Sequence, residues 1–132
     1  MLSILDISAS ALMAHSQRMN TSASNLANAD SAAGPDGVPY RPKHVVFEAR
    51  STGAGGVGGV RVRELIDETA ERCEYRPGHP SADANGYVTF PAVDPVGETV
   101  NLISASRSYE ANVEVMDTVK QTMLKTIMLG EG

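Results

Sequence analysis

The sequence predicts an α+β protein in which long N- and C-terminal helices pack as a coiled-coil-like pair, with a small β-rich insert between them. Three observations lead to this prediction: a C-terminal stretch without helix breakers, a seven-residue repeat near the N-terminus, and turn signals confined to the middle. The expected segments are residues 1–30 for the N-terminal helix of the core domain, 31–93 for the β and loop insert, and 94–132 for the C-terminal helix.

The C-terminal helix is the clearest element. The chain has no proline after Pro95 and no glycine between Gly97 and Gly130, and Asp94 before Pro95 is a typical helix start. A helix of about 33 residues is roughly 50 Å long, too long to bury its apolar stripe against one compact domain. We therefore expect partner helices, including those of other molecules. The stripe comprises Leu102, Ala105, Tyr109, Asn112, Met116, Val119 and Met123, and a second row of Ile103, Val113 and Ile127 widens it.

The N-terminal helix is expected from residue 3 to about residue 28. Ser3 is a candidate N-cap, and Asp6 stands three positions later, where a capping-box acid is found. Small side chains predominate in its repeat, so the seam permits close approach of a second helix but buries little apolar area. The seam residues, at alternating steps of four and three, are Leu5, Ala9, Leu12, Ser16, Met19, Ala23 and Leu26.

Short strands are expected in the insert at residues 44–49, 60–65 and 87–90, with a continuation of the second through residues 73–75. The run Gly53–Gly59 matches the G-x-G-x-x-G pattern of dinucleotide-binding loops. A phosphate-binding loop of this kind leads into a helix, whereas here β-branched alternation follows. We therefore interpret the run as a flexible hairpin tip.

Composition restricts the class of protein. The formal net charge is -5 and no basic run occurs, which argues against nucleic-acid binding. No apolar run approaches the length of a membrane span, so direct membrane insertion is not expected. Cys73 is the single cysteine, so no internal disulfide is expected. The N-terminus also lacks the basic and apolar regions of a signal peptide.

No set of side chains has the pattern of an active site or metal centre. Cys73 and His79 could act as nucleophile and base, but no third group orients them, and a lone cysteine in a strand is usually a small buried residue. His15 and His44 show no metal-ligand spacing with the other candidates. Two of the three carboxylates Asp83, Asp94 and Glu98 are better explained as turn and cap residues. We expect no enzyme activity, no cofactor and no metal.

Three motifs resemble those of bacterial flagellar rod, hook and hook-associated proteins. The first ends the N-terminal helix at Ser24, Asn25, Leu26, Ala27 and Asn28. The second is Pro77-Gly78-His79-Pro80-Ser81-Ala82-Asp83-Ala84-Asn85-Gly86-Tyr87-Val88, and the third is Ser104-Ala105-Ser106-Arg107-Ser108-Tyr109-Glu110-Ala111-Asn112-Val113-Glu114-Val115. Together they look most like the flagellar basal-body rod proteins, specifically the smaller proximal-rod subunits, over residues 2–130.

This resemblance implies a structural subunit that assembles helically through its terminal helices and transmits torque from the membrane ring to the distal rod and hook. It implies export by the flagellar type III apparatus without a cleaved signal peptide, into the rod that spans the periplasm. The implied partners are copies of the chain, other rod proteins, and the base formed by the membrane ring and export gate. Asn25 and Asn28 would cap the helix or bind a neighbour. The alternative is a cytoplasmic coiled-coil adaptor or export chaperone, which leaves the β insert unexplained. The expected subunit-interface residues are Leu5, Leu12, Met19, Leu26, Leu102, Tyr109, Val113, Met116, Val119, Met123 and Ile127.

Overall fold

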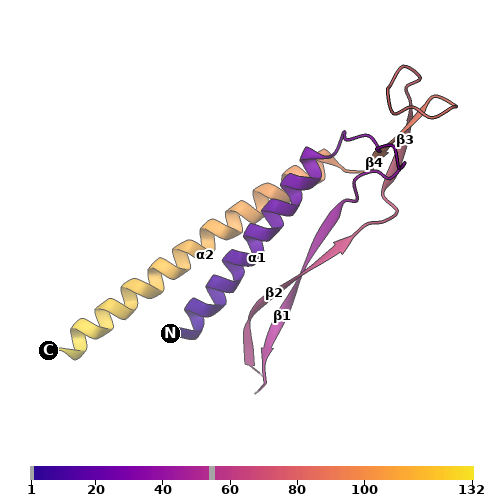
Figure 1. Cartoon of the computed structure of the whole chain (residues 1–132). Helices are drawn as coiled ribbons and strands as arrows, with labels where there is room; N and C mark the ends of the chain where they lie inside the picture. The colour runs from indigo at the N-terminus through magenta and orange to yellow at the C-terminus, as the bar shows by residue number, and fades with distance from the viewer. Residues whose placement is uncertain (1, 54–55) are drawn as a thin grey trace.

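A computed structural model describes residues 2–53 and 56–132 and consists of an antiparallel helix pair with two small β-sheets (Figure 1). Helix α1 spans Leu2–Ala27 and helix α2 spans Pro95–Gly130, so the α+β class predicted from the sequence is confirmed. The chain rises along α1 and returns along α2, which brings both termini to the same end of the molecule (Figure 1). Because α2 has 36 residues and α1 has 26, α2 continues past the start of α1.

The helix ends follow local sequence chemistry. At the start of α2, the Asp94 carboxylate accepts a hydrogen bond from the Val96 amide at 3.1 Å, and Pro95 occupies the first helical position. At the end of α1, the Asn28 side-chain amide donates to the Ser24 carbonyl at 2.8 Å. The predicted N-cap at Ser3 is wrong, because α1 already includes Leu2.

Four strands form two antiparallel hairpins. Strands β1 (Lys43–Thr52) and β2 (Gly56–Ile66) pair with His44 opposite Leu65 and Phe47 opposite Val62. Strands β3 (Glu71–Tyr75) and β4 (Tyr87–Pro91) form the second sheet. The expected strands are thus found and are mostly longer than predicted, but β3 is a separate strand and does not continue β2.

The glycine-rich run lies mostly in a strand. Residues 56–59 belong to β2 and pair back toward β1, so the hairpin turn is narrower than the predicted tip over Gly53–Gly59, and residues 54–55 of that tip lie outside the described residues. A strand on each side of the run is incompatible with a phosphate-binding loop, which needs a helix N-terminus.

Helix α1 lies between α2 and the β1–β2 hairpin (Figure 1). On the hairpin side, the Val60 amide donates to Ser10 Oγ at 3.0 Å, and the rings of His15 and Phe47 meet edge to face at 5.1 Å. The apolar core among the described residues is thin and is built largely from small side chains. Its members are Ala14, Ala29, Ala33, Val88, Phe90 and Ala105.

The β3–β4 sheet lies at the end of the helix pair where α1 stops (Figure 1). Arg72 anchors it: the guanidinium stacks 4.9 Å from the Phe90 ring centroid and pairs with Asp30 at 2.8 Å. The Ala33 amide also donates to the Thr89 carbonyl at 2.8 Å. These contacts join the sheet to the segment that follows α1.

Candidate assembly interface

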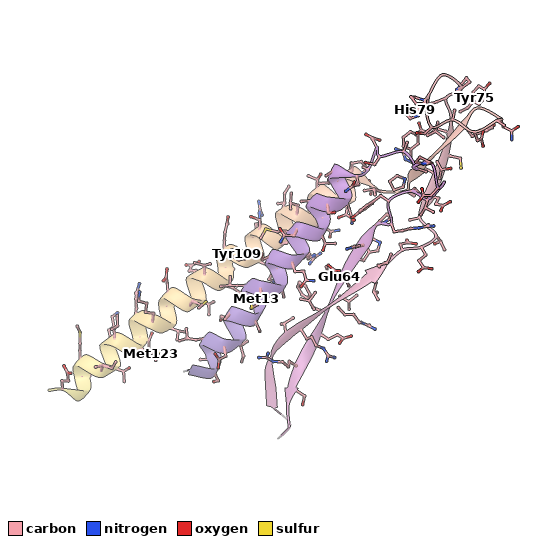
Figure 2. The ribbon with its side chains drawn as sticks, viewed as in Figure 1. Met13, Glu64, Tyr75, His79, Tyr109 and Met123 are labelled. Atoms are coloured by element: carbon pink, nitrogen blue, oxygen red, sulfur yellow. The ribbon has the colours of Figure 1, made fainter. Side chains whose placement is uncertain are left out.

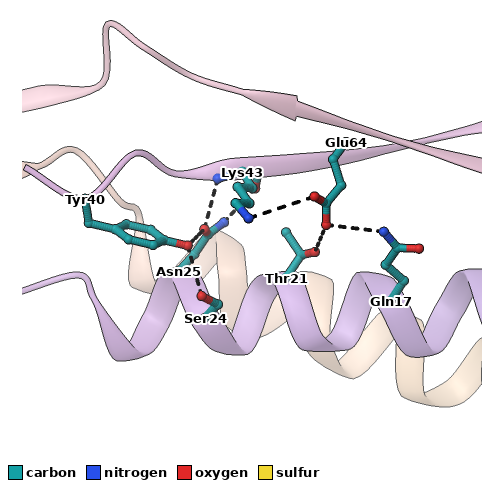
Figure 3. A network of polar contacts seen from close by, with 7 residues as sticks. All are labelled: Gln17, Thr21, Ser24, Asn25, Tyr40, Lys43 and Glu64. Atoms are coloured by element: carbon teal, nitrogen blue, oxygen red, sulfur yellow. Dashed lines mark hydrogen bonds and ion pairs between the residues drawn. The ribbon is translucent and has the colours of Figure 1, made fainter.

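A buried polar junction centred on Asn25 joins α1, β1 and α2. Figure 3 shows its contacts with Tyr40 and Lys43. The Asn25 Nδ2 group donates to the Lys43 carbonyl at 2.8 Å and to Glu98 Oε1 at 3.0 Å. Its Oδ1 accepts from the Lys43 amide and from the Tyr40 hydroxyl, both at 3.0 Å. Asn25 is fully buried, and these four bonds use the whole hydrogen-bonding capacity of its amide. The junction therefore satisfies the polar groups that it buries.

The network continues along the hairpin side of α1 (Figure 3). Glu64 of β2 accepts from Gln17 at 3.2 Å and from Thr21 at 3.4 Å, and it lies 3.9 Å from the Lys43 ammonium. Because Glu64 is exposed, these contacts add little to the free energy of unfolding, and their main effect is to orient the hairpin on α1. They fix the height at which the hairpin lies along α1.

The prediction for the two asparagines is half right. Asn28 caps α1, as expected, by bonding the Ser24 carbonyl. Asn25 neither caps the helix nor faces outward, because its partners belong to β1, to the loop before it and to α2. Sequence reasoning missed Tyr40, Lys43 and Glu98, and the only available signal was an asparagine in the last turn of α1, beside the last seam residue Leu26.

Most residues of the predicted seam are partly buried in the structure. Leu5, Leu12, Met19 and Leu26 are partly buried on α1, and Leu102, Met116, Val119 and Met123 are partly buried on α2. Ala105 is fully buried. Tyr109 lies across from Leu12 and Ser16 and near Met13 of α1 (Figure 2). Two serines, Ser8 and Ser22, are more deeply buried than these leucines, whereas the predicted Ala23 is exposed.

Helix α2 leaves much of its apolar surface exposed. The second row fails to widen the buried stripe, because Ile103, Val113 and Ile127 are 51%, 40% and 57% exposed. Every residue from 124 to 132 is exposed, since α2 has run past the start of α1. Apolar patches of this kind mark contact surfaces in soluble proteins. Their members on α2 are Val96, Val100, Ile103, Tyr109, Val113, Val115, Leu124, Ile127, Met128 and Leu129.

Cys73 and His79, the pair considered for catalysis, contact different residues in the structure. Cys73 is exposed on β3, contrary to the expectation of burial, and its sulfur lies 3.8 Å from the Thr89 hydroxyl. The His79 ring meets that of Phe90 edge to face, and its Nδ1 accepts from the Ser81 amide at 3.1 Å. Cys73 and His79 thus have different neighbours.

The carboxylates Asp83 and Glu98 make hydrogen bonds within the fold, and His15 lies partly buried on α1. Asp83 accepts from two backbone amides of the 83–87 turn, and Glu98 binds Asn25. Burial, aided by the positive charge of Arg18, lowers the pKa of His15, whose buried Nδ1 has no partner among the described residues. Within residues 2–53 and 56–132, no three His, Cys, Asp or Glu side chains are grouped as metal ligands. No helix in the same ranges is long and apolar enough to cross a bilayer.

Two protein-family models match the parts of the chain that contain the helices. A model of the flagella basal body rod protein matches residues 5–35, and a model of the flagellar basal body rod FlgEFG protein C-terminal region matches residues 84–129. The flagellar basal-body rod proteins FlgC of Escherichia coli O157:H7 and Salmonella typhimurium are each 58% identical over 132 residues, covering 99% of this chain and 98% of the relative. FlgC of Buchnera aphidicola subsp. Schizaphis graminum is 45% identical over 134 residues, with the same coverage. The chain belongs to the FlgC family.

The two family matches coincide with the two helices of the structure. The segment matched by the rod-protein model contains most of α1 and Asn25, and the segment matched by the C-terminal model contains β4 and all but the last residue of α2. The chain is therefore a structural subunit of the flagellar rod. The resemblance noted at residues 24–28, 77–88 and 104–115 is confirmed by relatives that match along nearly the whole chain.

Proposed function

We propose that this chain builds the proximal part of the flagellar rod by helical assembly through α1 and α2, and that it transmits torque from the membrane ring toward the distal rod and hook. The observation that carries the proposal is the exposed apolar surface of α2 in a chain of the FlgC family. A helix that is apolar on more than one face is normally buried on more than one side. In a rod, neighbouring subunits supply the missing sides.

The interface residues of the proposal fall into two groups. Those between α1 and α2 hold each subunit's helix pair together, whereas Val113 and Ile127 are exposed and remain for contacts with neighbours. Residues 1–30 and 94–132 then form the core domain of the rod, and residues 31–93 form its outer part. The full set is Leu5, Leu12, Met19, Leu26, Leu102, Tyr109, Val113, Met116, Val119, Met123 and Ile127.

Resistance to twisting is the mechanical requirement of this function. A helix pair transmits torque only if its two helices cannot slide past each other. The Asn25 junction opposes sliding, because its hydrogen bonds join α1 to β1 and to Glu98 of α2 and satisfy all of them at one register. This geometry supports a role of the helix pair in carrying mechanical load.

The proposed location is the periplasm-spanning rod, reached by type III export without signal-peptide removal, and the proposed partners are other rod subunits and the base with its export gate. Purified hook–basal bodies from the source organism test this by mass spectrometry. We expect peptides of this chain, including an intact N-terminal one. Recovery of the chain only from the cytosol, with basal bodies that lack it, would contradict the proposal and favour an adaptor or export chaperone.

A substitution tests the outward surface directly. Ile127 lies beyond α1 and is more than half exposed, so Ile127→Asp leaves the isolated subunit folded but places a charge in the rod contact. We expect loss of swimming and loss of the chain from basal bodies. Val38→Asp is the matched control, because Val38 is 50% exposed in the loop between α1 and β1. Equal swimming of both variants would show that this part of α2 is not an interface.

A further inference from the structure

The molecule has two opposite outer faces, because α1 is the middle of three layers. One is the outer face of the β1–β2 hairpin, and the other is the row of α2 that points away from α1 (Figure 1). A row with steps of four and three runs along α2 opposite the seam. We name these residues the outer row: Val96, Val100, Ile103, Arg107, Glu110, Glu114, Asp117, Gln121, Leu124 and Met128.

The outer face of the hairpin follows from strand alternation. Phe47 and Glu64 contact α1, so the residues that alternate with them point away from it. Arg61 and Arg63 both pair with Glu48 on this face, at 2.8 and 3.0 Å, and their side chains are 71% and 59% exposed. Two arginines on one glutamate leave a net positive charge. Leu65, 43% exposed, continues the face toward the end of β2.

The outer row of α2 has the complementary pattern. Its first turns are apolar, with Val100 and Ile103 60% and 51% exposed. Its middle is acidic, because Glu110, Glu114 and Asp117 follow one another at helical spacing, and all three are exposed. The ion pairs within the described residues include none of these three carboxylates. Arg107 is the single basic residue between the apolar and acidic parts.

The two faces match in height along the helix axis as well as in charge. At the upper level, Asn25 joins Lys43 of β1 to Glu98 of α2, so Leu65 lies level with the start of the outer row. Further along, Ser10 bonds the amide of Val60 in β2, whereas Tyr109 lies across from Leu12 and Ser16. Arg61 therefore lies at the level of Glu110, and Arg63 lies two strand residues, about 7 Å, nearer the start of α2. A sideways shift of one molecule would bring Leu65 to the apolar first turns of the outer row and Arg61 to Glu110.

We propose that the outer face of the hairpin of one subunit docks on the outer row of α2 of a second copy beside it. The contact rests on the proposed rod function and specifies its lateral interface. It joins two different surfaces, so it repeats from copy to copy and generates a curved row of subunits. A symmetric contact is disfavoured, because hairpin on hairpin would oppose arginines and α2 on α2 would oppose carboxylates.

Cross-linking between engineered cysteines tests the contact. In a Cys73→Ser parent, Arg61→Cys and Glu110→Cys place one thiol on each face, and both positions are exposed, so folding is not disturbed. Because α1 separates the two faces, a bond between these thiols forms only between molecules. Hook–basal bodies carrying the double variant are treated with a short thiol cross-linker, and we expect chain dimers and higher multimers with the two introduced thiols joined. The matched control, Arg61→Cys with Lys125→Cys, moves the α2 thiol about four turns away, and we expect no ladder.

The outcomes separate this inference from the rod function. If the Cys73→Ser parent is present in basal bodies but the Arg61→Cys/Glu110→Cys pair cross-links no better than the control, the lateral contact is wrong and the rod function stands. If the parent is absent from basal bodies, the rod function itself is wrong. A cross-link from the thiol of the Arg61→Cys substitution to another rod protein, in place of a second copy, would overturn the identity of the partner.

Discussion

Exchanging Asn25 for aspartate tests the polar junction with almost no change in shape. The substitution removes both amide donors, which leaves the Lys43 carbonyl without its partner and faces Glu98 with a second carboxylate. A buried acceptor without a partner costs about 1–3 kcal/mol. Two unit charges at the 3.0 Å separation of Asn25 Nδ2 and Glu98 Oε1 repel by about 5 kcal/mol at an effective dielectric constant of about 20.

We expect the free energy of unfolding to fall by about 3–5 kcal/mol at neutral pH. This is less than the sum of the two terms, because partial protonation relieves part of the repulsion. That is a large share of the total stability of a small protein. The sign of the pH dependence follows from linkage: the carboxyl introduced next to Glu98 binds its proton more tightly in the folded state than in the unfolded state. The deficit should therefore grow as pH rises through the unfolded pKa and shrink as pH falls toward about 4.

Urea unfolding followed by circular dichroism measures the effect. Asn20→Asp on the same helix is the control, because Asn20 is exposed and the chemical change is identical. Adding Glu98→Gln to Asn25→Asp returns a donor opposite the new carboxylate and should recover roughly half of the loss. If Asn25→Asp unfolds at the same urea concentration as Asn20→Asp at every pH, the junction does not stabilise the helix pair.

Three further substitutions have defined outcomes. Burial and a nearby cation lower the pKa of His15 from its ordinary 6.5, so the unfolded chain binds a proton before the folded chain does. The free energy of unfolding should therefore fall as pH drops below about 6.5. His15→Leu should remove this part of the pH dependence, as measured by urea titrations at several pH values. Gly59→Ala places a methyl group 2.3 Å from Ser10 Oγ at a φ of +111°, so it should lower the thermal midpoint, whereas Gly78→Ala, with open space around it, should not. Asp94→Ala removes the cap of α2 and should cost about 1 kcal/mol in the same denaturation assay; no change would show that the cap is dispensable.

The positions of the elements follow from the sequence because they depend on neighbouring residues. Asp94 and Pro95 begin a helix wherever the rest of the chain lies, and a stretch without proline or glycine continues it. Strand alternation and the Asn85-Gly86 turn similarly locate β4, and Gly86 adopts the positive φ that this turn requires. Helix and strand existence is therefore accessible from local chemistry, although strand ends extend further than the pattern indicates.

Burial and pairing depend on distant residues, and here the sequence is less informative. Asn25 obtains partners 15, 18 and 73 residues away, so a single-residue pattern does not distinguish a cap from a buried junction. Ser8 and Ser22 are buried because closely approaching helices favour small side chains, whereas apolar periodicity selected Ala23. Cys73 is exposed because its sheet has only two strands and leaves one face open.

The junction and the two outer faces depend on each other. A seam built from alanine, serine and a few larger residues discriminates weakly between helix registers, since a shift by one turn replaces one small side chain with another. Asn25 and Glu98 supply the missing discrimination, because their hydrogen bonds are satisfied at one register only. A slip of one turn would move the outer row by about 5.4 Å relative to the hairpin and separate Arg61 from the level of Glu110. Weakening the junction should therefore also weaken the lateral cross-link, even though Asn25 lies far from both thiols.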